Sequence, residues 1–474
     1  ISFYYIFQYN ILIDREMLRN VMETNASEAL DLVNYNFIVL TVLFTALTAW
    51  LLSKVVVENK GWFRNIWSQI KAIFFALSFI IVLLYASYSN YASVARSHRE
   101  LSYLILPTNF IFAGFSYAQE LLVNNQIPFK SLTMDVKHHS QYKTPKRQVT
   151  VLIVGETARA DHLGINGYSK NTTPNLNRRL KNKQGDLVNF QQASSCGTTT
   201  AISLPCMFSY LTRKEYSHKK GKNSSNLLDF ISKAGIDVQW RDNNTGCKSI
   251  CDRVDLIDFS HETDPAFCSS GECYDEILLK GLKQHILEGK KDQLIVLHQK
   301  GSHGPAYYLR YPKEFEVFKP TCQTVNLQKC SKESLNNSYD NSILYTDYVI
   351  DKTIAILEAM PNDTQVSLIY ISDHGESLGE NNLYLHGTPY VIAPEVQTHV
   401  PFLFWQPTDQ LAQARVDMSC MNNKSTHPVS HDQLFHSVLG LLNVETSLYQ
   451  ENNDLFSSCQ SRSQVMLTSS AKEN

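Results

Sequence analysis

Residues 149–163 read VTVLIVGETARADHL, and this stretch places a carboxylate directly behind a strongly apolar run. Residues 149–154 carry no charge and are rich in β-branched side chains, which predicts a strand buried on both faces of a sheet. Gly155 and Glu156 follow at once. A glutamate at a strand end is usually solvated, so Glu156 becomes a candidate functional residue only through the rest of the chain.

Further apolar runs follow and alternate with helix-like stretches. The strand candidates are residues 149–154, 237–240, 293–299, 367–372 and 400–405. The helix-like segments include residues 225–235 and 339–360. The alternation predicts an α/β domain over residues 148–474, with a mostly parallel sheet flanked by helices. Ligands of such sheets bind beyond the carboxyl ends of the strands, which is where Glu156 is expected.

A second strand candidate ends on comparable chemistry. Residues 367–372 are followed by Asp373, His374, Gly375 and Glu376. Carboxylate oxygen and imidazole nitrogen are common zinc donors. Alone, the Asp-His pair is explained better by a turn with a capping aspartate, but two acidic strand ends, one with a histidine, favour a metal site.

The third element is residues 194–206, SSCGTTTAISLPC, in which three threonines precede a predicted helix. A hydroxyl at a helix N-terminus lies where backbone N–H groups favour an anion. An ordinary threonine N-cap explains the same pattern. Beside a zinc ion, however, such a hydroxyl would become nucleophilic, because zinc lowers the pKa of an oxygen that binds it. A bridge between Cys196 and Cys206 would brace this loop.

The first part of the chain indicates a membrane anchor. Residues 37–53 and 72–93 are free of charge and close to the length that crosses a hydrocarbon core of about 30 Å. One such run could be a buried soluble helix, but two favour membrane spans. The opening ISFYYIFQYNILI resembles the end of a further span, with earlier spans expected before it. We therefore expect a transmembrane region over residues 1–93 and a bridging segment at the membrane surface over residues 94–147.

Loop charges and cysteines predict the same orientation. Four basic residues and one acidic residue lie between the two spans, whereas the loop over residues 10–36 is mainly acidic, so the former is expected in the cytoplasm and the latter outside. All ten cysteines follow residue 195, and repeated CxxC spacing typical of zinc ribbons is absent from the sequence. They occur as Cys196/Cys206, Cys247/Cys251, Cys268/Cys273, Cys322/Cys330 and Cys420/Cys459. This pattern indicates disulfides in an oxidising compartment such as the bacterial periplasm.

The net charge of −2 argues against nucleic acid as a partner, because proteins that bind it usually carry a basic face. Several long motifs instead resemble the phosphoethanolamine transferases of Gram-negative bacteria, above all those acting on lipid A and the mobile colistin-resistance type. The motifs are VGETARADHLGINGY, SCGTTTAISLPCMFS, WRDNN, HQKGSHGPAY and SDHGESLGENNLYLHG. The resemblance implies an alkaline-phosphatase-like, sulfatase-superfamily domain in the periplasm, held by a multi-pass anchor in the inner membrane.

The resemblance also implies roles for individual residues. The implied zinc ligands are Glu156, Thr200, Asp373 and His374. Thr200 is the implied nucleophile, a choice that spacing alone does not make among Thr198, Thr199 and Thr200. The implied substrate-binding residues are Asn244, Lys248, His303, Glu376, His386, and, in the loop over residues 10–36, Asn20, Thr24 and Glu28. His303 and His386 would protonate the leaving group or hold a second zinc ion. Steps of four would also place Asn20, Thr24 and Glu28 on one helical face.

The implied reaction transfers phosphoethanolamine from phosphatidylethanolamine to a lipid A phosphate through a covalent phospho-threonine. The modified surface would bind polymyxin and other cationic peptides less well, and the enzyme is expected to be a monomer. The alternatives are a lipopolysaccharide core sugar or another envelope acceptor, a sulfatase or phosphatase, a glycerol phosphate transferase, and a non-catalytic binding protein. The sulfatase alternative requires a C/S-x-P-x-R pattern, which CGTTT does not match.

Overall fold

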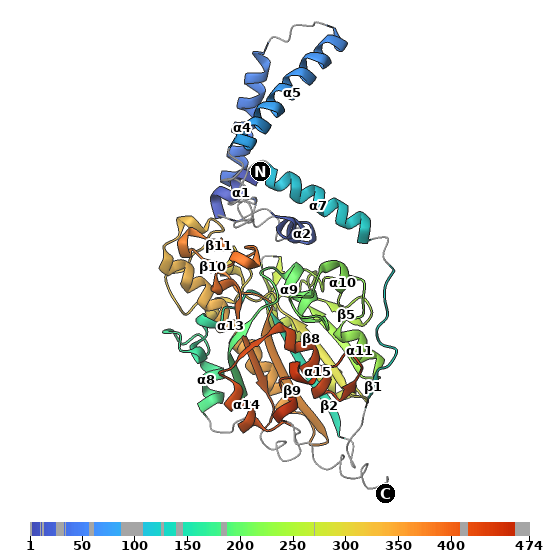
Figure 1. Cartoon of the computed structure of the whole chain (residues 1–474). Helices are drawn as coiled ribbons and strands as arrows, with labels where there is room; N and C mark the ends of the chain where they lie inside the picture. The colour runs from blue at the N-terminus through green and yellow to red at the C-terminus, as the bar shows by residue number, and fades with distance from the viewer. Residues whose placement is uncertain are drawn as a thin grey trace.

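The structure is a computed structural model of the chain (Figure 1). It describes residues 2–9, 11, 14–24, 33, 35–55, 61–86, 108–124, 128–138, 146–181, 187–269, 271–407 and 416–459.

An eight-stranded sheet forms the centre of the C-terminal domain, which confirms the predicted α/β class. From one edge to the other, the strands are β13 (Pro428–Ser430), β3 (Leu187–Ser194), β12 (His399–Trp405), β9 (Thr364–Ser372), β2 (Arg147–Gly155), β8 (Gln293–His298), β4 (Asp237–Asp242) and β5 (Asp255–Asp258). The strands from β9 to β5 are parallel to one another, and β12 is antiparallel to both of its neighbours. The five predicted strands all form, and β3, β5 and β13 join them.

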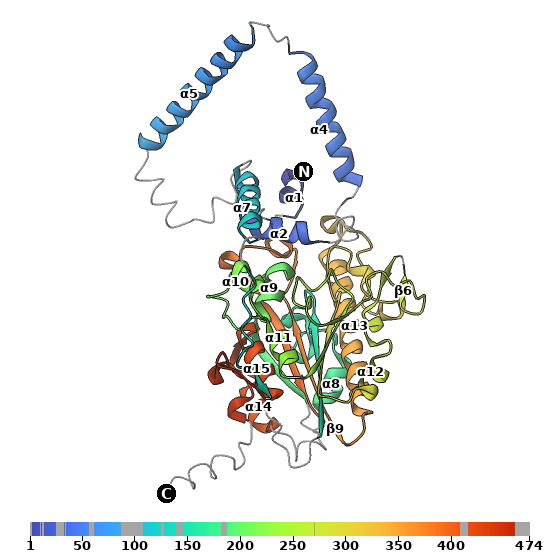
Figure 2. The ribbon, with the colours of Figure 1, turned by 90° about the vertical axis from the view of Figure 1, so that its right-hand side faces the viewer.

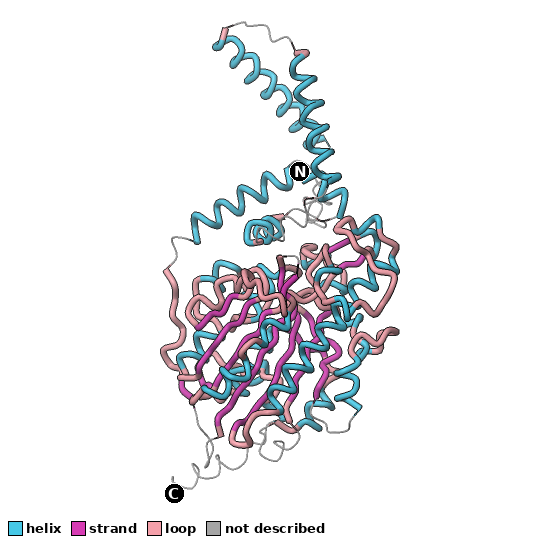
Figure 3. Tube along the Cα trace, turned by 180° about the vertical axis from the view of Figure 1, so that it is seen from behind, coloured by secondary structure: helices cyan, strands magenta, loops and turns pink. Residues whose placement is uncertain are grey.

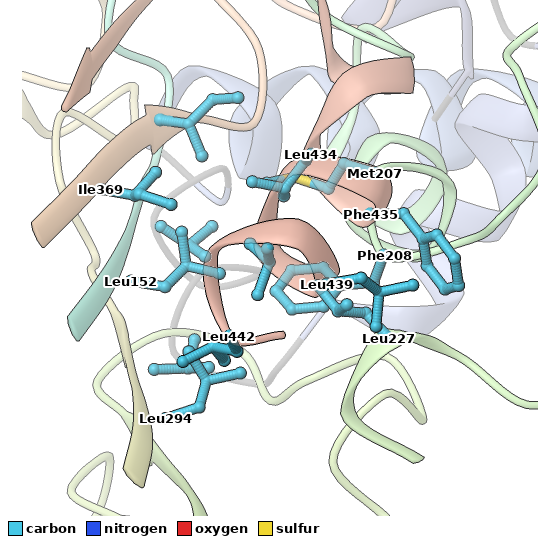
Figure 4. Close-up of a cluster of buried hydrophobic side chains, with 14 of the residues drawn as sticks. Leu152, Met207, Phe208, Leu227, Leu294, Ile369, Leu434, Phe435, Leu439 and Leu442 are labelled. Atoms are coloured by element: carbon cyan, nitrogen blue, oxygen red, sulfur yellow. The ribbon is translucent and has the colours of Figure 1, made fainter. Parts of the chain in front are cut away.

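Helices cover both faces of this sheet (Figures 2 and 3). Along β2, Val151 and Ile153 pack with α8 (Pro174–Lys181), α12 (Leu282–Glu288) and α13 (Lys332–Glu358). The alternate residue Leu152 packs with α9 (Thr200–Met207), α11 (Leu227–Lys233), α14 (Met418–Lys424) and α15 (Leu434–Leu441) in the cluster of Figure 4. Successive side chains of a strand point to opposite faces of the sheet, so the apolar run of β2 contributes to the hydrophobic clusters on both faces.

Two-stranded pairs complete the domain. They are β1 (Lys137–His138) with β14 (Val444–Glu445), β6 (Cys268–Ser269) with β7 (Glu272–Cys273), and β10 (Ser377–Leu378) with β11 (Tyr384–Leu385).

Two described helices are long and apolar enough to cross a membrane: α4 (Tyr35–Ser53) and α5 (Trp62–Ala86). Helix α4 matches the predicted span, but α5 begins ten residues before the predicted start at residue 72. The prediction began the span after Lys71, whereas the helix includes both Arg64 and Lys71. Single cations near a helix end are tolerated because their long side chains reach the interface. Two of the four basic residues assigned to the loop between the spans therefore lie in the helix.

Shorter helices lie between the apolar helices and the domain. Helices α1 (Ser2–Tyr9), α2 (Arg15–Glu23) and α7 (Thr108–Asn124) are all found on the side of the domain where α9 and α10 (His218–Lys222) lie (Figures 1 and 2). Gln8 Nε2 donates to Asn326 Oδ1 at 2.7 Å, which ties α1 to the domain. Helix α7 was not predicted, because its apolar side chains are spread around a helix and form no strand-like run.

Candidate active site and metal centre

The ends of β2 and β9 bring three candidate ligands together. Gly155 of β2 pairs with Ser372 of β9, so the residues after each strand leave the same edge of the sheet side by side. Gly155 is required there, because a Cβ atom would lie 2.5 Å from the hydroxyl oxygen of Tyr370. Glu156 follows on one strand, and Asp373 and His374 follow on the other. The sheet edge predicted to hold the site is thus confirmed.

Glu156, Asp373 and His374 form a compact, fully buried triad. One ligand atom from each lies within 4.8 Å of the others. His374 Nε2 is 3.5 Å from Glu156 Oε1 and 3.3 Å from Asp373 Oδ2. Two carboxylate oxygens and an imidazole nitrogen directed at one point are a donor set typical of zinc.

The hydrogen bonds around the triad leave three atoms facing one another. His374 Nδ1 lies 2.9 Å from the carbonyl oxygen of Gly375, which can only accept, so the proton is on Nδ1 and the lone pair is on Nε2. Asp373 Oδ1 accepts from the backbone N–H of Thr157 and of His374. Glu156 Oε1 and Asp373 Oδ2 are buried with no hydrogen-bond partner among the described residues. Buried carboxylate oxygens without donors fit a bound cation.

The pKa values of the triad follow from burial. Burial, together with the negative charge of the neighbouring Asp373, raises the pKa of Glu156 to about 7. Burial also raises the pKa of Asp373 to about 6 and lowers the pKa of His374 to about 4. The neutral imidazole is the form that binds a metal, and a cation would stabilise both carboxylates in their charged form.

Thr200 is the threonine that faces the triad. It is the first residue of α9, and its Oγ1 lies 3.0 Å from Glu156 Oε2 and 3.4 Å from His374 Nε2. Thr198 turns away and donates to the carbonyl of Thr388 at 2.7 Å. Thr199 is the N-cap residue, but its side chain makes no capping hydrogen bond. The ordinary interpretation, in which a threonine side chain caps α9 by a hydrogen bond, is therefore wrong.

Asn244 joins the triad from the carboxyl end of β4. Its Nδ2 donates to Glu156 Oε2 at 2.9 Å and to the carbonyl of Gln299 at 2.9 Å. Lys248 points elsewhere: its ammonium donates to the carbonyl and hydroxyl oxygens of Thr245 and to the carbonyl of Glu23 in α2. Lys248 thus links the domain to α2, and its predicted contact with substrate stays a prediction.

His386, Glu376 and His303 form a second cluster beside the triad. The His386 ring lies 4.4 Å from the ring of His374 and 5.6 Å from that of His303, measured between centroids. His386 Nδ1 is 2.7 Å from Glu376 Oε2, and Tyr307 donates to Glu376 Oε1 at 2.6 Å. The structure therefore groups these three predicted residues as expected.

Charges in this cluster separate the two histidines. Burial lowers the pKa of His386, but the charge and hydrogen bond of Glu376 outweigh burial and raise it to about 9. Burial lowers the pKa of His303 well below its usual value, and the positive charge of His386 adds to this effect. At neutral pH, His386 is protonated and His303 is neutral.

The three predicted lipid-contact residues are not all on one helix. Asn20 lies in α2, and Thr24 caps the end of that helix, where its hydroxyl donates to the Asn20 carbonyl at 2.6 Å. Glu28 lies outside the described residues. Helix α2 ends at Glu23 and the Thr24 backbone is extended, so the predicted helical face does not reach Thr24, and the lipid contacts of all three residues stay a prediction.

Sequence reasoning missed residues that position the site. Asp242 and His298, at the carboxyl ends of β4 and β8, are 2.9 Å apart, and His298 Nε2 lies 3.3 Å from Asn244 Nδ2. Because ligands gather at the carboxyl ends of parallel strands, the sequence could have indicated Asp242 and His298. His431 could not be found that way: its ring accepts from the Cys196 N–H at 3.1 Å and donates to the Ser372 carbonyl at 2.9 Å. Nothing in the local sequence marks it.

All five predicted disulfides form: Cys196–Cys206, Cys247–Cys251, Cys268–Cys273, Cys322–Cys330 and Cys420–Cys459. The first joins the loop before Thr200 to the far end of α9. Because Cys196 is bonded, it is unavailable as the modified cysteine of a sulfatase. Thr200 stays the predicted nucleophile.

The mixed sheet and its ligand cluster define an enzyme of the sulfatase and alkaline phosphatase superfamily. The sulfatase family profile matches residues 148–444, and a second profile, described as phosphoethanolamine transferase EptA/EptB, matches residues 1–122. "Phosphoethanolamine transferase EptA" of Escherichia coli K12 is 40% identical over 466 residues, which cover 96% of this chain and 83% of that protein. "Phosphatidylethanolamine transferase Mcr-1" of E. coli is 37% identical over 85% of this chain and 76% of its own length.

A solved structure supports the same relationship. The integral membrane lipooligosaccharide phosphoethanolamine transferase A (EptA) from Neisseria meningitidis matches with a TM-score of 0.90 and 38% identity, over 96% of this chain and 84% of that one. The chain belongs to the phosphoethanolamine transferase family and is an enzyme of that class. The family assignment predicted from the motifs is confirmed.

Proposed function

We propose that the enzyme transfers phosphoethanolamine from phosphatidylethanolamine to a phosphate group of lipid A through a covalent intermediate on Thr200. One observation carries the proposal: the Thr200 hydroxyl, at the start of α9, lies within 3.0–3.4 Å of two members of the buried triad. A hydroxyl in that position is poised to attack a phosphodiester. The named activities of the relatives support the same chemistry.

A zinc ion would be held by Glu156, Asp373, His374 and the hydroxyl of Thr200. When bound, it would lower the pKa of that hydroxyl and offset negative charge on the phosphoryl oxygens. The donor set supports zinc, since one imidazole nitrogen and carboxylate oxygens converge without competing hydrogen-bond donors. A second zinc ion between His303 and His386 stays a prediction, and the positive charge of His386 disfavours it.

In the first step, the Thr200 hydroxyl passes its proton to Glu156 Oε2, to which it donates at 3.0 Å. Thr200 Oγ1 forms a bond to the donor phosphorus, and the bond from phosphorus to the diacylglycerol oxygen breaks. His386 is the protonated histidine of the second cluster, so we assign it the proton that the leaving oxygen takes up. Glu376 holds the His386 ring through Nδ1, which leaves Nε2–H free to donate. Asn244 keeps Glu156 in place through its amide.

In the second step, an oxygen of the acceptor phosphate bonds to the same phosphorus, and the bond to Thr200 Oγ1 breaks. Glu156 returns the proton to Thr200 Oγ1, His386 takes up a proton from water, and the enzyme is regenerated. Each transferred group adds an amine next to a phosphate of the acceptor, so cationic peptides such as polymyxin would bind the modified surface less well.

The donor is a membrane lipid, and the two apolar helices α4 and α5 suit an anchor in the inner membrane. Five disulfides support a periplasmic position of the catalytic domain. With α4 and α5 crossing the membrane, α2 and α7 would lie at its outer surface, directly above the candidate site.

The covalent intermediate is testable by intact-mass spectrometry. The purified chain, mixed with phosphatidylethanolamine and no acceptor, should gain the mass of one phosphoethanolamine group, and Thr200→Ala should gain none. Addition of lipid A should remove the added mass and produce modified lipid A. Thr353→Ala, which alters a buried threonine of α13 away from the site, is the matched control. A Thr200→Ala protein that still transfers the group would end the proposal.

A further inference from the structure

His386 lies at the open end of a short hairpin. Strands β10 and β11 are antiparallel, and Ser377 pairs with Leu385 at that end. Glu376 comes directly before β10 and His386 directly after β11, so the two side chains leave the same end of the hairpin. They meet there, with His386 Nδ1 at 2.7 Å from Glu376 Oε2. The position of His386 therefore depends on what holds this end of the hairpin closed.

The backbone on both sides of His386 is in the left-handed region. Leu385 has a φ of 65°, and Gly387 has a φ of 89°. Glycine adopts this conformation readily, but a leucine in it costs free energy and keeps it only where neighbouring groups hold the backbone. Gly387 is also needed for space, since a Cβ atom would lie 2.3 Å from Cε of Met17 and 3.2 Å from Cγ2 of Thr199. A strained turn beside a functional side chain indicates that other residues fix it.

Gln397 holds this turn through its side-chain amide, which is fully buried. Its Nε2 donates to the carbonyl of Leu385 at 3.2 Å and to Ser377 Oγ at 2.8 Å. Its Oε1 accepts from the backbone N–H of Thr388 at 3.1 Å. The carbonyl can only accept and the N–H can only donate, so the amide has a single orientation. Gln397 thus joins both strands of the hairpin and binds the turn on either side of His386.

Backbone hydrogen bonds connect the same turn to the rest of the site. The Gln397 carbonyl accepts from the N–H of Gly375, just before β10, at 3.0 Å. On the other side of the turn, the Gly387 N–H donates to the carbonyl of Thr198 at 2.9 Å, in the loop before the nucleophile. The turn that carries His386 is therefore held between Gln397 and the nucleophile loop. Neither step of the proposed reaction uses Gln397.

We propose that Gln397 is a positioning residue, whose amide holds the turn so that His386 Nε2–H is directed at the leaving oxygen of the donor lipid. This inference rests on the proposed function and specifies how its first step is supplied with a proton. The Thr200 Oγ1–phosphorus bond forms while the bond to the diacylglycerol oxygen breaks, and the His386 proton moves to that oxygen. Without the Gln397 amide, the turn loses a donor and an acceptor, the strained Leu385 backbone relaxes, and the ring moves out of reach.

Two donors with different leaving groups test the proposal. The full chain in detergent is given either phosphatidylethanolamine or the 4-nitrophenyl ester of phosphoethanolamine, whose nitrophenolate leaves as a stable anion and needs no proton. Gln397→Met keeps the length of the side chain and removes its amide. Formation of the covalent intermediate, followed by intact mass, should slow about thirtyfold with the lipid and less than about twofold with the nitrophenyl ester. His386→Gln should show the same selectivity with a larger loss, of about a hundredfold.

A second variant and a control accompany Gln397→Met. Gln397→Glu keeps an acceptor for the Thr388 N–H, and it should show the same selectivity between donors with a smaller loss. The matched control is Gln365→Met, which alters a buried glutamine at the opposite end of β9 that accepts from Gln148 Nε2 at 3.2 Å. It should leave both rates within about twofold of wild type, because it lies far along the strand from the turn.

A double-mutant cycle and amide exchange separate positioning from a general loss of structure. In the His386→Gln background, Gln397→Met should slow the lipid reaction by at most about a further twofold, because it acts through His386. Amide hydrogen exchange of Gly387 and Thr388 should quicken at least about tenfold in Gln397→Met, while zinc content stays at the wild-type value.

The possible outcomes divide clearly. Equal slowing with both donors, additive losses in the double mutant, or unchanged amide exchange of the turn would each overturn the role of Gln397. A His386→Gln protein that does not discriminate between the donors would instead contradict the proton donor of the proposed function. In that case the exchange rates would still decide whether Gln397 holds the turn.

Discussion

Glu156 is fully buried. One of its carboxylate oxygens accepts hydrogen bonds from Asn244 and Thr200, and the other has no donor among the described residues. Glu156→Gln keeps the shape but supplies an N–H where a cation would bind. We expect zinc content, measured by plasma mass spectrometry after dialysis, to fall below one tenth of the wild-type value, and the transfer rate to fall at least about a hundredfold. Glu358→Gln, an exposed glutamate of α13, is the control. Full zinc occupancy in Glu156→Gln would remove Glu156 from the ligand set.

His386 gives the reaction a pH dependence that can be worked out from its neighbours. A general acid must be protonated, so the rate should fall as pH rises through the His386 pKa of about 9. Glu376→Gln removes the charge that holds this pKa up, so burial should dominate and the alkaline limb should move to lower pH by at least one unit. The pH profile of kcat tests this, and an unchanged alkaline limb in Glu376→Gln would argue for another proton donor.

At the scale of elements, His431 connects the loop before α9 to the end of β9. Burial lowers its pKa to about 3, below the 6.5 of an exposed histidine. Because the unfolded chain binds this proton more readily than the folded one, the stability that neutral His431 supports is present above pH 6.5 and is lost as pH falls from there towards 3. In urea unfolding, His431→Gln should lower the free energy of unfolding at pH 7 by about 1–3 kcal/mol and flatten its acid dependence. An equally steep acid dependence would exclude His431 as its source.

The N-terminus of α13 offers a separate test at the same scale. Ser331 is its N-cap, and its side chain accepts from the Ser334 N–H. Ser331→Ala should cost about 1 kcal/mol of stability in the same urea measurement. Ser331→Asp preserves the acceptor and should restore it, while an undiminished Ser331→Ala protein would show that the cap contributes nothing.

At the scale of the whole molecule, the strand ends explain what the sequence made predictable. Apolar runs marked five strands, and the rule that ligands gather at their carboxyl ends placed Glu156, Asp373 and His374 together. Helix α7 and strand β3 were missed, because their apolar residues show no simple period. Thr200 could not be chosen among three threonines from the sequence pattern, since only the fold decides which hydroxyl faces the triad. His431 was missed because its role depends on contacts with Cys196 and Ser372, which lie 235 and 59 residues away in the chain.

The division between anchor and domain leads to a last prediction. The core clusters on both faces of the sheet contain only residues after 131, so a chain starting at residue 128 should fold, keep its disulfides and bind zinc. That protein lacks α2 and α7 and also α4 and α5, the two helices proposed to anchor the site at a bilayer. We expect transfer between lipids in vesicles to fall at least about a hundredfold, while a soluble short-chain donor still modifies Thr200. Intact-mass measurements of both reactions, with the full chain as reference, test this. Undiminished transfer in vesicles by the shortened protein would show that the N-terminal helices do not position the lipids.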